Sequence, residues 1–318
     1  MHYMLNRCNR DRISQSKSGM PKSLLLFLVI SLALSGVVLA QDEGNAAESG
    51  PALWKLSTED TTLYLFGSIH LMTEGVDWFT GPVRDAFQTS DTLLVEINQK
   101  EVSRQEQQSI VRSVAVLPQG EQLSDMVSEP TMESLTELVE PMGVSAQVVE
   151  RWKPWYAGLT VTGVLAQQAG FLPRYGVDIT LIEKASSGDM SIESLETFEG
   201  QFQLFDSLNR EEGLYLLRDA LEEQGEIRRL FRDLREAWMS RDLETLETLM
   251  LEAEEENPEF YEDVFVDRNQ TWTEELVSML AEQEGPIFMA VGAGHLLGDD
   301  SVIRMLESQG YEVSRIRG

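Results

Sequence analysis

Two stretches decide the fold: Leu63-Tyr-Leu-Phe-Gly-Ser-Ile-His-Leu-Met72 and Phe288-Met-Ala-Val-Gly-Ala-Gly-His-Leu-Leu297. Each has four apolar residues, a glycine, two small or apolar residues, a histidine and two more apolar residues. An apolar run that ends in glycine indicates a buried strand followed by a sharp turn. Ligands and catalytic side chains of α/β proteins collect at strand ends, so we expect His70 and His295 to lie in a functional site.

The segments around the two stretches also correspond. Residues 82–89 and 301–309 have helical patterns, and residues 91–97 and 311–316 read as strands, so each histidine is followed by helix and strand. This duplicated strand–Gly-x-x-His–helix–strand unit predicts an α/β fold with a mixed central sheet. We expect strands 63–66 and 288–291 near its centre, related by an approximate two-fold axis, with both imidazoles pointing into one cleft.

The chain between the two units is mostly helical in pattern. Residues 102–284 place apolar side chains at helical spacing, which predicts a large helical insertion that forms one wall of the cleft. Residues 189–196 are short and mixed, and we expect them to return one strand to the sheet. Upstream, residues 53–65 predict a β-hairpin whose second strand leads into Gly67.

Residues 1–40 have the features of a signal peptide. Five basic residues precede the apolar run 24–34, and Val38-Leu39-Ala40 forms a small-residue cleavage site. We expect a periplasmic or secreted protein, with 41–52 as a flexible linker and 53–318 as the folded domain. Met1 and Met20 are both candidate starts. An uncleaved apolar run would instead anchor the chain in a membrane.

Composition excludes several kinds of chemistry and partner. The only cysteine, Cys8, precedes the apolar run, so the domain has no disulfide, cysteine nucleophile or thiolate metal site. Without residues 1–40, 20 basic residues face 53 acidic ones, a net charge of −33. Such a surface repels nucleic acid and anionic lipid, and we expect neither as a partner apart from membrane contact through an uncleaved leader.

The histidines and one acid predict a metal site. Glu96 ends an apolar strand, where an unpaired carboxylate would be costly, so it must meet a cation. Imidazole and carboxylate together suit Mn, Co, Zn or Fe as divalent ions. We therefore expect His70, His295 and Glu96 to hold a divalent metal cation. The alternative is that both histidines are only packed in the core.

Three more charged residues stand beside apolar residues and outside the acidic runs: Asp178, Glu196 and Arg268. With a metal-bound water, Glu196 or Asp178 would take the proton. Arg268 would stabilise negative charge on the substrate or pair with the acids. The alternative reading of each one alone is a helix cap or a salt bridge.

These motifs together resemble the TraB/PrgY/GumN family, which includes the Tiki Wnt-inactivating proteases and is remotely related to the erythromycin esterases and ChaN-like proteins. The resemblance runs from about Trp54 to the C-terminus and is strongest for the GumN-like branch. The resemblance rests on these motifs: Gly67-Ser-Ile-His-Leu71, Gly75-Val-Asp-Trp78, Ser90-Asp-Thr-Leu-Leu-Val-Glu96, Pro154-Trp155, Gly176-Val-Asp178, Leu195-Glu-Thr197, Arg268-Asn269 and Val291-Gly-Ala-Gly-His-Leu296.

The resemblance implies a duplicated α/β core and, as in Tiki-like members, metal-dependent peptide hydrolysis. It places His70 and His295 in the paired motifs, with the four charged residues around them. The leading function is an exported metal-dependent hydrolase of a peptide or a related amide or ester. The alternatives are a non-catalytic protein that binds or sequesters peptides or pheromones, and a structural envelope protein.

Overall fold

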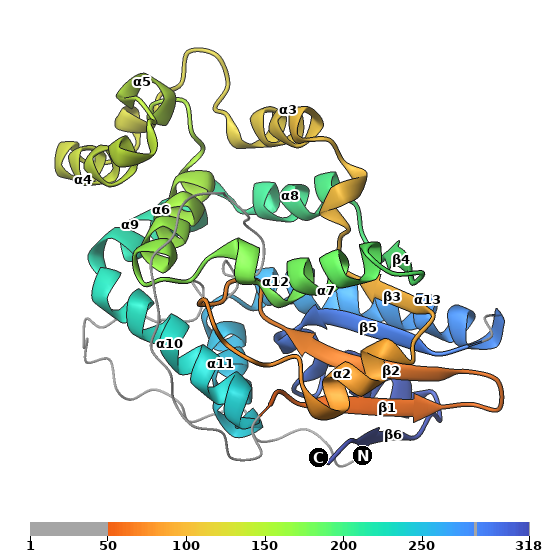
Figure 1. Cartoon of the computed structure of the whole chain (residues 1–318). Coiled ribbons are helices and arrows are strands. Elements are labelled where there is room, and N and C mark those ends of the chain that lie inside the picture. Colours follow the sequence, from red (N-terminus) through yellow and green to blue (C-terminus); the bar gives the residue numbers. More distant parts are fainter. Residues whose placement is uncertain (1–49, 283–284, 318) are drawn as a thin grey trace, which may run out of the picture.

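The computed structural model describes residues 50–282 and 285–317 (Figure 1). The expected signal peptide and most of the expected linker lie outside these residues. The last linker residues, Gly50 to Ala52, are buried, and the Gly50 carbonyl accepts a 2.6 Å hydrogen bond from Arg241 Nε. Residues 50–52, which were predicted to be part of the flexible linker, thus pack against the fold. Among the described residues, no helix is long and apolar enough to cross a membrane.

A six-stranded mixed sheet runs in the order β4-β3-β5-β2-β1-β6. Strands β2, β5, β3 and β4 are mutually parallel, whereas β1 is antiparallel to both β2 and β6. The predicted hairpin and the returned strand are confirmed as β1–β2 and β4. The strands are β1 (Leu53–Ser57), β2 (Thr62–Ser68), β3 (Thr92–Val95), β4 (Ser191–Ser194), β5 (Ile287–Gly292) and β6 (Val313–Arg315).

Helices cover both faces of the sheet (Figure 1). Phe66, Leu93 and Val95 pack with α2 and α7, whereas Leu65 and Leu94 pack with α13 and α14 on the other face. This alternation follows the two-residue period of a strand and explains why the central strands are apolar throughout. The covering helices are α2 (Gly81–Gln88), α7 (Val177–Ser186), α13 (Asp267–Glu282) and α14 (Val302–Ser308).

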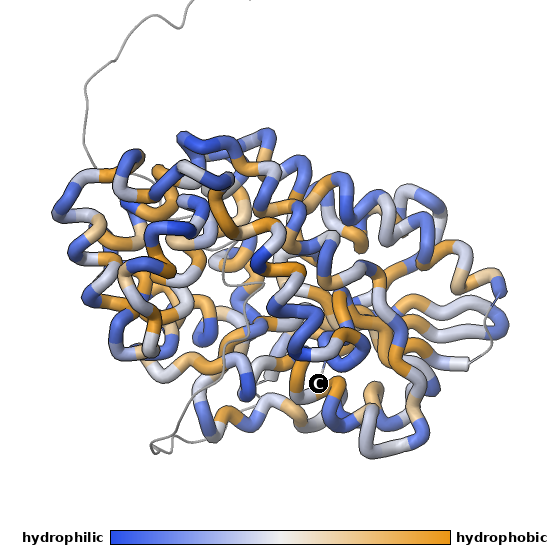
Figure 2. Tube along the Cα trace, turned by 90° about the horizontal axis from the view of Figure 1, so that it is seen from above, coloured by the Kyte–Doolittle hydropathy of each residue, from blue (hydrophilic) through white to orange (hydrophobic). Residues whose placement is uncertain are grey.

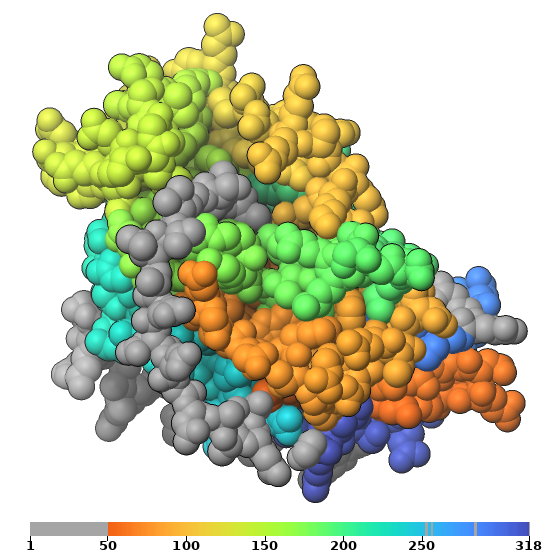
Figure 3. All heavy atoms as spheres, in the orientation of Figure 1, coloured from red at the N-terminus to blue at the C-terminus, as the bar shows by residue number. Residues whose placement is uncertain are grey.

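Most of the predicted helical insertion forms a lobe at one end of the sheet, while its α7, β4 and α13 belong to the sheet and its covering layers. Its own core centres on α6, which is buried on almost every side, as expected of a helix that is apolar all round. In Figure 3, α3 to α5 project above α7. The lobe comprises α3 (Arg104–Ala115), α4 (Glu129–Val139), α5 (Ala146–Val149), α6 (Pro154–Gln168), α8 (Phe198–Ser207), α9 (Arg210–Glu222), α10 (Gln224–Ser240), α11 (Leu243–Glu256) and α12 (Pro258–Tyr261).

Hydrophobic segments run through the interior, while hydrophilic segments lie on the outside of the molecule (Figure 2). Short helical turns connect the longer elements. A turn of π-helix, η5, comes directly before α13. The turns are η1 (Gln99–Glu101), η2 (Leu123–Asp125), η3 (Glu140–Met142), η4 (Pro173–Tyr175), η5 (Glu262–Val266) and η6 (Ala293–Leu296).

The two motif strands, β2 and β5, are adjacent and central, as predicted. The last strands of the two duplicated units, β3 and β6, occupy different positions in the sheet. Buried β3 lies beside β5, whereas β6 lies at the sheet edge because β1 of the hairpin occupies the position next to β2. Glu96 is consequently buried, while Arg315, in the corresponding sequence position, is exposed.

Candidate functional site

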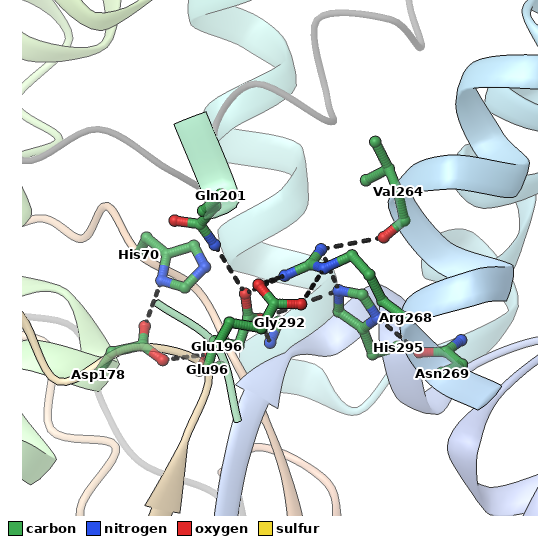
Figure 4. A network of polar contacts seen from close by, with 11 residues as sticks. His70, Glu96, Asp178, Glu196, Gln201, Val264, Arg268, Asn269, Gly292 and His295 are labelled. Atoms are coloured by element: carbon green, nitrogen blue, oxygen red, sulfur yellow. Dashed lines mark hydrogen bonds and ion pairs between the residues drawn. The ribbon is translucent and has the colours of Figure 1, made fainter. Parts of the chain in front are cut away.

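The carboxyl ends of four parallel strands deliver the site. Ser68 ends β2, Glu96 follows β3, Glu196 follows β4, and Gly292 ends β5. His70 and His295 lie in the turns after β2 and β5, on either side of Glu96 (Figure 4). The site therefore occupies the sheet edge where α/β proteins place their ligands.

Gly67 of the first motif serves close packing, whereas Gly292 of the second ends β5 at the point where the chain turns into η6. Neither glycine has a left-handed backbone. Gly67 still belongs to β2, and Gly292 has an ordinary φ of −48°. A Cβ on Gly67 would lie 2.9 Å from Ala293 Cα, so the two motif turns pack directly against each other. At Gly176, a Cβ would overlap the carbonyl oxygen of His70. Glycine thus lets α7 begin against the His70 turn.

His70 is paired with an aspartate from α7. Its Nδ1 lies 2.6 Å from Asp178 Oδ2, and Ser68 Oγ donates a 2.7 Å hydrogen bond to Asp178 Oδ1. The backbone N–H of Val177 donates to the carbonyl of Ile69, which ties the start of α7 to the turn. With Nδ1 facing the carboxylate, the remaining nitrogen, Nε2, carries the lone pair of neutral His70. This Nε2 is buried and has no hydrogen-bond partner among the described residues.

The surroundings of His70 raise its pKa above the ordinary value of 6.5. Burial opposes the imidazolium, but the charge and hydrogen bond of Asp178 and the charge of Glu96 outweigh burial and the repulsion of Arg268. For Asp178, burial raises the pKa, but His70 and the Ser68 hydroxyl outweigh it, and the pKa is lowered. The pair thus favours an imidazolium next to a carboxylate.

Arg268 holds the second part of the site together. The backbone N–H of Glu196 bonds the carbonyl of Glu96, so the two carboxylates are neighbours. Arg268 lies between them, with Nε 2.6 Å from Glu196 Oε1, Nη2 3.0 Å from Glu196 Oε2 and Nη2 2.8 Å from Glu96 Oε2. Neighbouring like charges would destabilise the sheet, and the guanidinium offsets them.

The remaining donors of Arg268 are also used. Nη1 donates to the Val264 carbonyl at 2.9 Å, at the π turn, and contacts His295 Nε2 at 3.1 Å. A guanidinium has five N–H donors, and these five contacts engage all of them. The arginine that we expected to stabilise a substrate therefore has no free donor in this arrangement.

The protonation of His295 follows from its partners. Asn269 Nδ2 donates to the Asp300 carbonyl, so its Oδ1 faces His295 Nδ1 at 2.6 Å. Because that oxygen can only accept, Nδ1 carries the proton and Nε2 accepts from Arg268. The ring is fully buried between Phe265 and Trp272, with centroid distances of 4.7 Å and 4.3 Å.

Burial and the nearby positive charges act together on His295. Burial, Arg268 and His70 lower its pKa well below 6.5, so the ring is neutral at physiological pH. Glu196 shows the opposite balance. Burial raises its pKa, and the charge of Glu96 adds to this, while Arg268 only partly opposes it.

Arg268 contacts two of the three expected metal ligands, and these contacts determine whether their lone pairs are available to a metal. It contacts His295 Nε2 and Glu96, and Glu96 further accepts from Gly292 N at 2.6 Å and Gln201 Nε2 at 3.2 Å. Among the described residues, no three His, Cys, Asp or Glu side chains are grouped to hold a metal ion. One atom does fit, because His70 Nε2 is free and has a carboxylate on its other nitrogen, as ligating histidines usually do. Metal binding by the expected trio stays a prediction.

A cavity of about 440 Å³ adjoins the cluster. Glu196, Arg268 and Trp272 line its inner end, and the exposed carboxylates of Asp263 and Asp267 stand at its border. It lies between α8 and the η5–α13 segment, so both of its walls belong to the helical insertion, and neither His70 nor His295 lines it. The predicted cleft, with the insertion as one wall and both imidazoles pointing into it, is therefore not this cavity. An extended ligand in this cavity would reach the buried charges from one side.

All six residues expected in the site come together: His70, Glu96, Asp178, Glu196, Arg268 and His295 (Figure 4). Sequence reasoning missed the supporting roles of Ser68, Asn269 and Gln201. The first two had a signal, since each stands within a motif already noted. Gln201 had none, because its contact with Glu96 depends on how α8 packs.

Comparison with known proteins identifies the family of the chain. The model of the TraB/PrgY/gumN family matches residues 52–315. The chain belongs to this family. The sequence resemblance is therefore confirmed, and both Gly-x-x-His motifs fall within the matched part.

Relatives within the family are distant. The uncharacterized protein YbaP of Escherichia coli (strain K12) is 25% identical over 243 residues, which cover 76% of this chain and 87% of YbaP. Metalloprotease TIKI2 of Xenopus tropicalis is 24% identical over 300 residues, 79% of this chain and 57% of that protein. The Metalloprotease TIKI homolog of Amphimedon queenslandica is 21% identical over 349 residues, 92% and 67% of the two chains. No solved structure matches significantly.

Proposed function

We propose that this family member is a hydrolase that cleaves a peptide bond or a related amide or ester bond. The observation that carries the proposal is His70, whose Nδ1 faces Asp178 and whose Nε2 has no hydrogen-bond partner within residues 50–282 and 285–317. A carboxylate that orients one imidazole nitrogen leaves the other as a proton acceptor. The relatives named metalloproteases support hydrolysis as the reaction class.

The proposed reaction uses His70 as general base. Nε2 takes a proton from a water molecule as the water oxygen attacks the substrate carbonyl carbon. The imidazolium then returns this proton to the leaving nitrogen or oxygen as the scissile bond breaks. Asp178 stabilises the imidazolium through Nδ1, and Ser68 holds Asp178 in place. Water adds across the bond, and His70 ends in its starting state.

This assignment moves the proton acceptor from the residues that the sequence suggested. Asp178 contacts the imidazole and so acts through His70, whereas Glu196 is held by two hydrogen bonds from Arg268. The His70 side chain is 17% exposed, but its Nε2 is shielded. We therefore expect a substrate to displace the side chains that cover Nε2 before water reaches it.

A divalent metal, with Mn, Co, Zn or Fe as candidates, enters the proposal through the names of the relatives. Its expected ligands do not fit as arranged here, because Arg268 engages His295 and Glu96. No step above passes through a metal. We also propose that the protein acts in the periplasm or outside the cell, on the strength of the signal-peptide pattern in residues 1–40.

Peptide-library cleavage tests the proposal. The protein is incubated with the library, with and without added Mn²⁺, and products are identified by mass spectrometry. We expect cleavage that His70→Gln removes. Glu74→Gln, an exposed change on the same loop, serves as the matched control and should retain it. If peptides are retained on the protein but none is cleaved under either condition, the protein is a binding module and the hydrolase proposal fails.

A further inference from the structure

Arg268 occupies the centre of the cluster in which the sequence predicts a metal. Four of its five contacts go to Glu96, Glu196 and His295 Nε2. Carboxylate oxygens and an imidazole nitrogen are the atoms that divalent Mn, Co, Zn or Fe would take as ligands. The guanidinium and a metal would therefore compete for the same lone pairs.

The position of Arg268 is built into the fold. The side chain is 8% exposed, and its guanidinium carbon lies 4.6 Å from the centroid of the Trp272 ring. The π turn before α13 supplies the Val264 carbonyl to Nη1. Moving the arginine away would leave Glu96 and Glu196 buried side by side without a cation, which is strongly unfavourable.

The supporting residues orient the cluster toward the arginine. Asn269 fixes the proton on His295 Nδ1, which turns the lone pair of Nε2 to Arg268. Glu96 Oε1 accepts from the backbone N–H of Gly292, so its other oxygen faces Gln201 and Arg268. His70 stands outside this arrangement, since none of its contacts involves the arginine donors.

We infer that Arg268 is the resident cation of this cluster and takes the place of a divalent metal between Glu96, Glu196 and His295. The inference concerns the binding properties of the folded chain and does not depend on the proposed hydrolysis. It predicts that metal affinity at these residues is weak while Arg268 is present and appears when the guanidinium is removed.

Titration with Co²⁺ tests this inference. The full chain is stripped with chelator and titrated by calorimetry, and visible absorption is recorded to detect nitrogen ligands. We expect binding by the wild type to be unchanged in Glu96→Gln and in His295→Gln. In Arg268→Gln, we expect affinity to rise by at least about tenfold, because two buried carboxylates then lack a partner. The double change Arg268→Gln with Glu96→Gln should return affinity to the wild-type level.

Two controls keep the test decisive. Arg268→Lys retains a cation and should bind Co²⁺ as weakly as the wild type, and circular dichroism checks that each variant is folded. One equivalent of Co²⁺ bound by the wild type and lost in Glu96→Gln or His295→Gln would overturn the inference. So would a folded Arg268→Gln that binds no more tightly. If Arg268→Gln does not fold, the wild-type comparison with Glu96→Gln and His295→Gln decides alone.

Discussion

The two Gly-x-x-His turns share a sequence frame but give their histidines opposite surroundings. His70 is partly exposed, faces Asp178 through Nδ1 and has a free Nε2, whereas His295 is fully buried and bonded through both nitrogens. The pKa of His70 is raised because Asp178 outweighs burial, while burial and Arg268 lower that of His295. The motif brings an imidazole to a strand end, and the side chains packed around it decide what the ring does.

The largest expected effect separates the two histidines by activity. His70→Gln removes the proposed base, and general-base groups contribute on the order of 10²–10⁴-fold to rate. We expect kcat/KM to fall by this factor. The melting temperature should fall as well, because buried Asp178 loses the cation that faces it through Nδ1, so activity is compared at a temperature where the variant is folded. Steady-state kinetics and calorimetry check both parts, and a variant that is fully active would remove His70 from the mechanism.

Changing the second histidine should act on stability instead. His295→Leu leaves an N–H of Arg268 and the Asn269 carbonyl oxygen unsatisfied, which costs about 1–3 kcal/mol for each buried group. The unfolded wild type takes up a proton at His295 below pH 6.5, and the folded protein does not, so wild-type stability falls as pH drops below 6.5. Urea denaturation should therefore show a gap between the two proteins that narrows toward low pH. A gap that widens would contradict a neutral His295.

The close packing between the start of α7 and the His70 turn can be disrupted by a substitution at Gly176. Gly176→Ala would force its Cβ into the His70 carbonyl, and such overpacking costs about 1–3 kcal/mol. We expect lower thermal stability and lower kcat/KM, because the His70–Asp178 pair shifts. Gly163→Ala, which meets no atom within 4 Å, is the control and should be neutral or slightly stabilising. Equal effects of the two changes would show that the close approach at Gly176 is unimportant.

The smallest effect is a shift in pH dependence. Because the base must be deprotonated, activity of the wild type should rise with pH through a midpoint above 6.5. Asp178→Asn removes the charge that holds the imidazolium, so the midpoint should move to lower pH while the maximal rate falls. A kcat/KM profile between pH 5 and 9 measures the direction in which the midpoint moves. An upward movement of the midpoint would mean that Asp178 does not set the pKa of His70.

Much of the site follows from strand ends that can be read from the sequence. Glu96, after the apolar strand β3, had to be near a cation, and that cation is Arg268. The adjacency of β2 and β5 followed from their matched frames. Physical rules of burial and strand periodicity suffice for these elements.

What the sequence left open depends on long-range packing. The identity of the cation could not be read, because metal and guanidinium satisfy the same carboxylates. Gln201 reaches Glu96 from α8, 105 residues along the chain. The place of β6 at the edge depended on how the β1 hairpin fills the sheet. The cation, the Gln201 contact and the position of β6 each had alternatives with the same local sequence pattern. Only the folded structure distinguishes these alternatives.

The most direct test of the contrast between the two turns is an NMR titration of the ring nitrogens. Full-length chain with His2→Gln keeps only His70 and His295, and long-range ¹H–¹⁵N spectra are recorded from pH 5 to 9, with His70→Gln for assignment. We predict that one imidazole titrates with a midpoint above 6.5, while the other stays neutral with its proton on Nδ1. Two rings that both titrate near 6.5, or a His295 protonated on Nε2, would contradict the account.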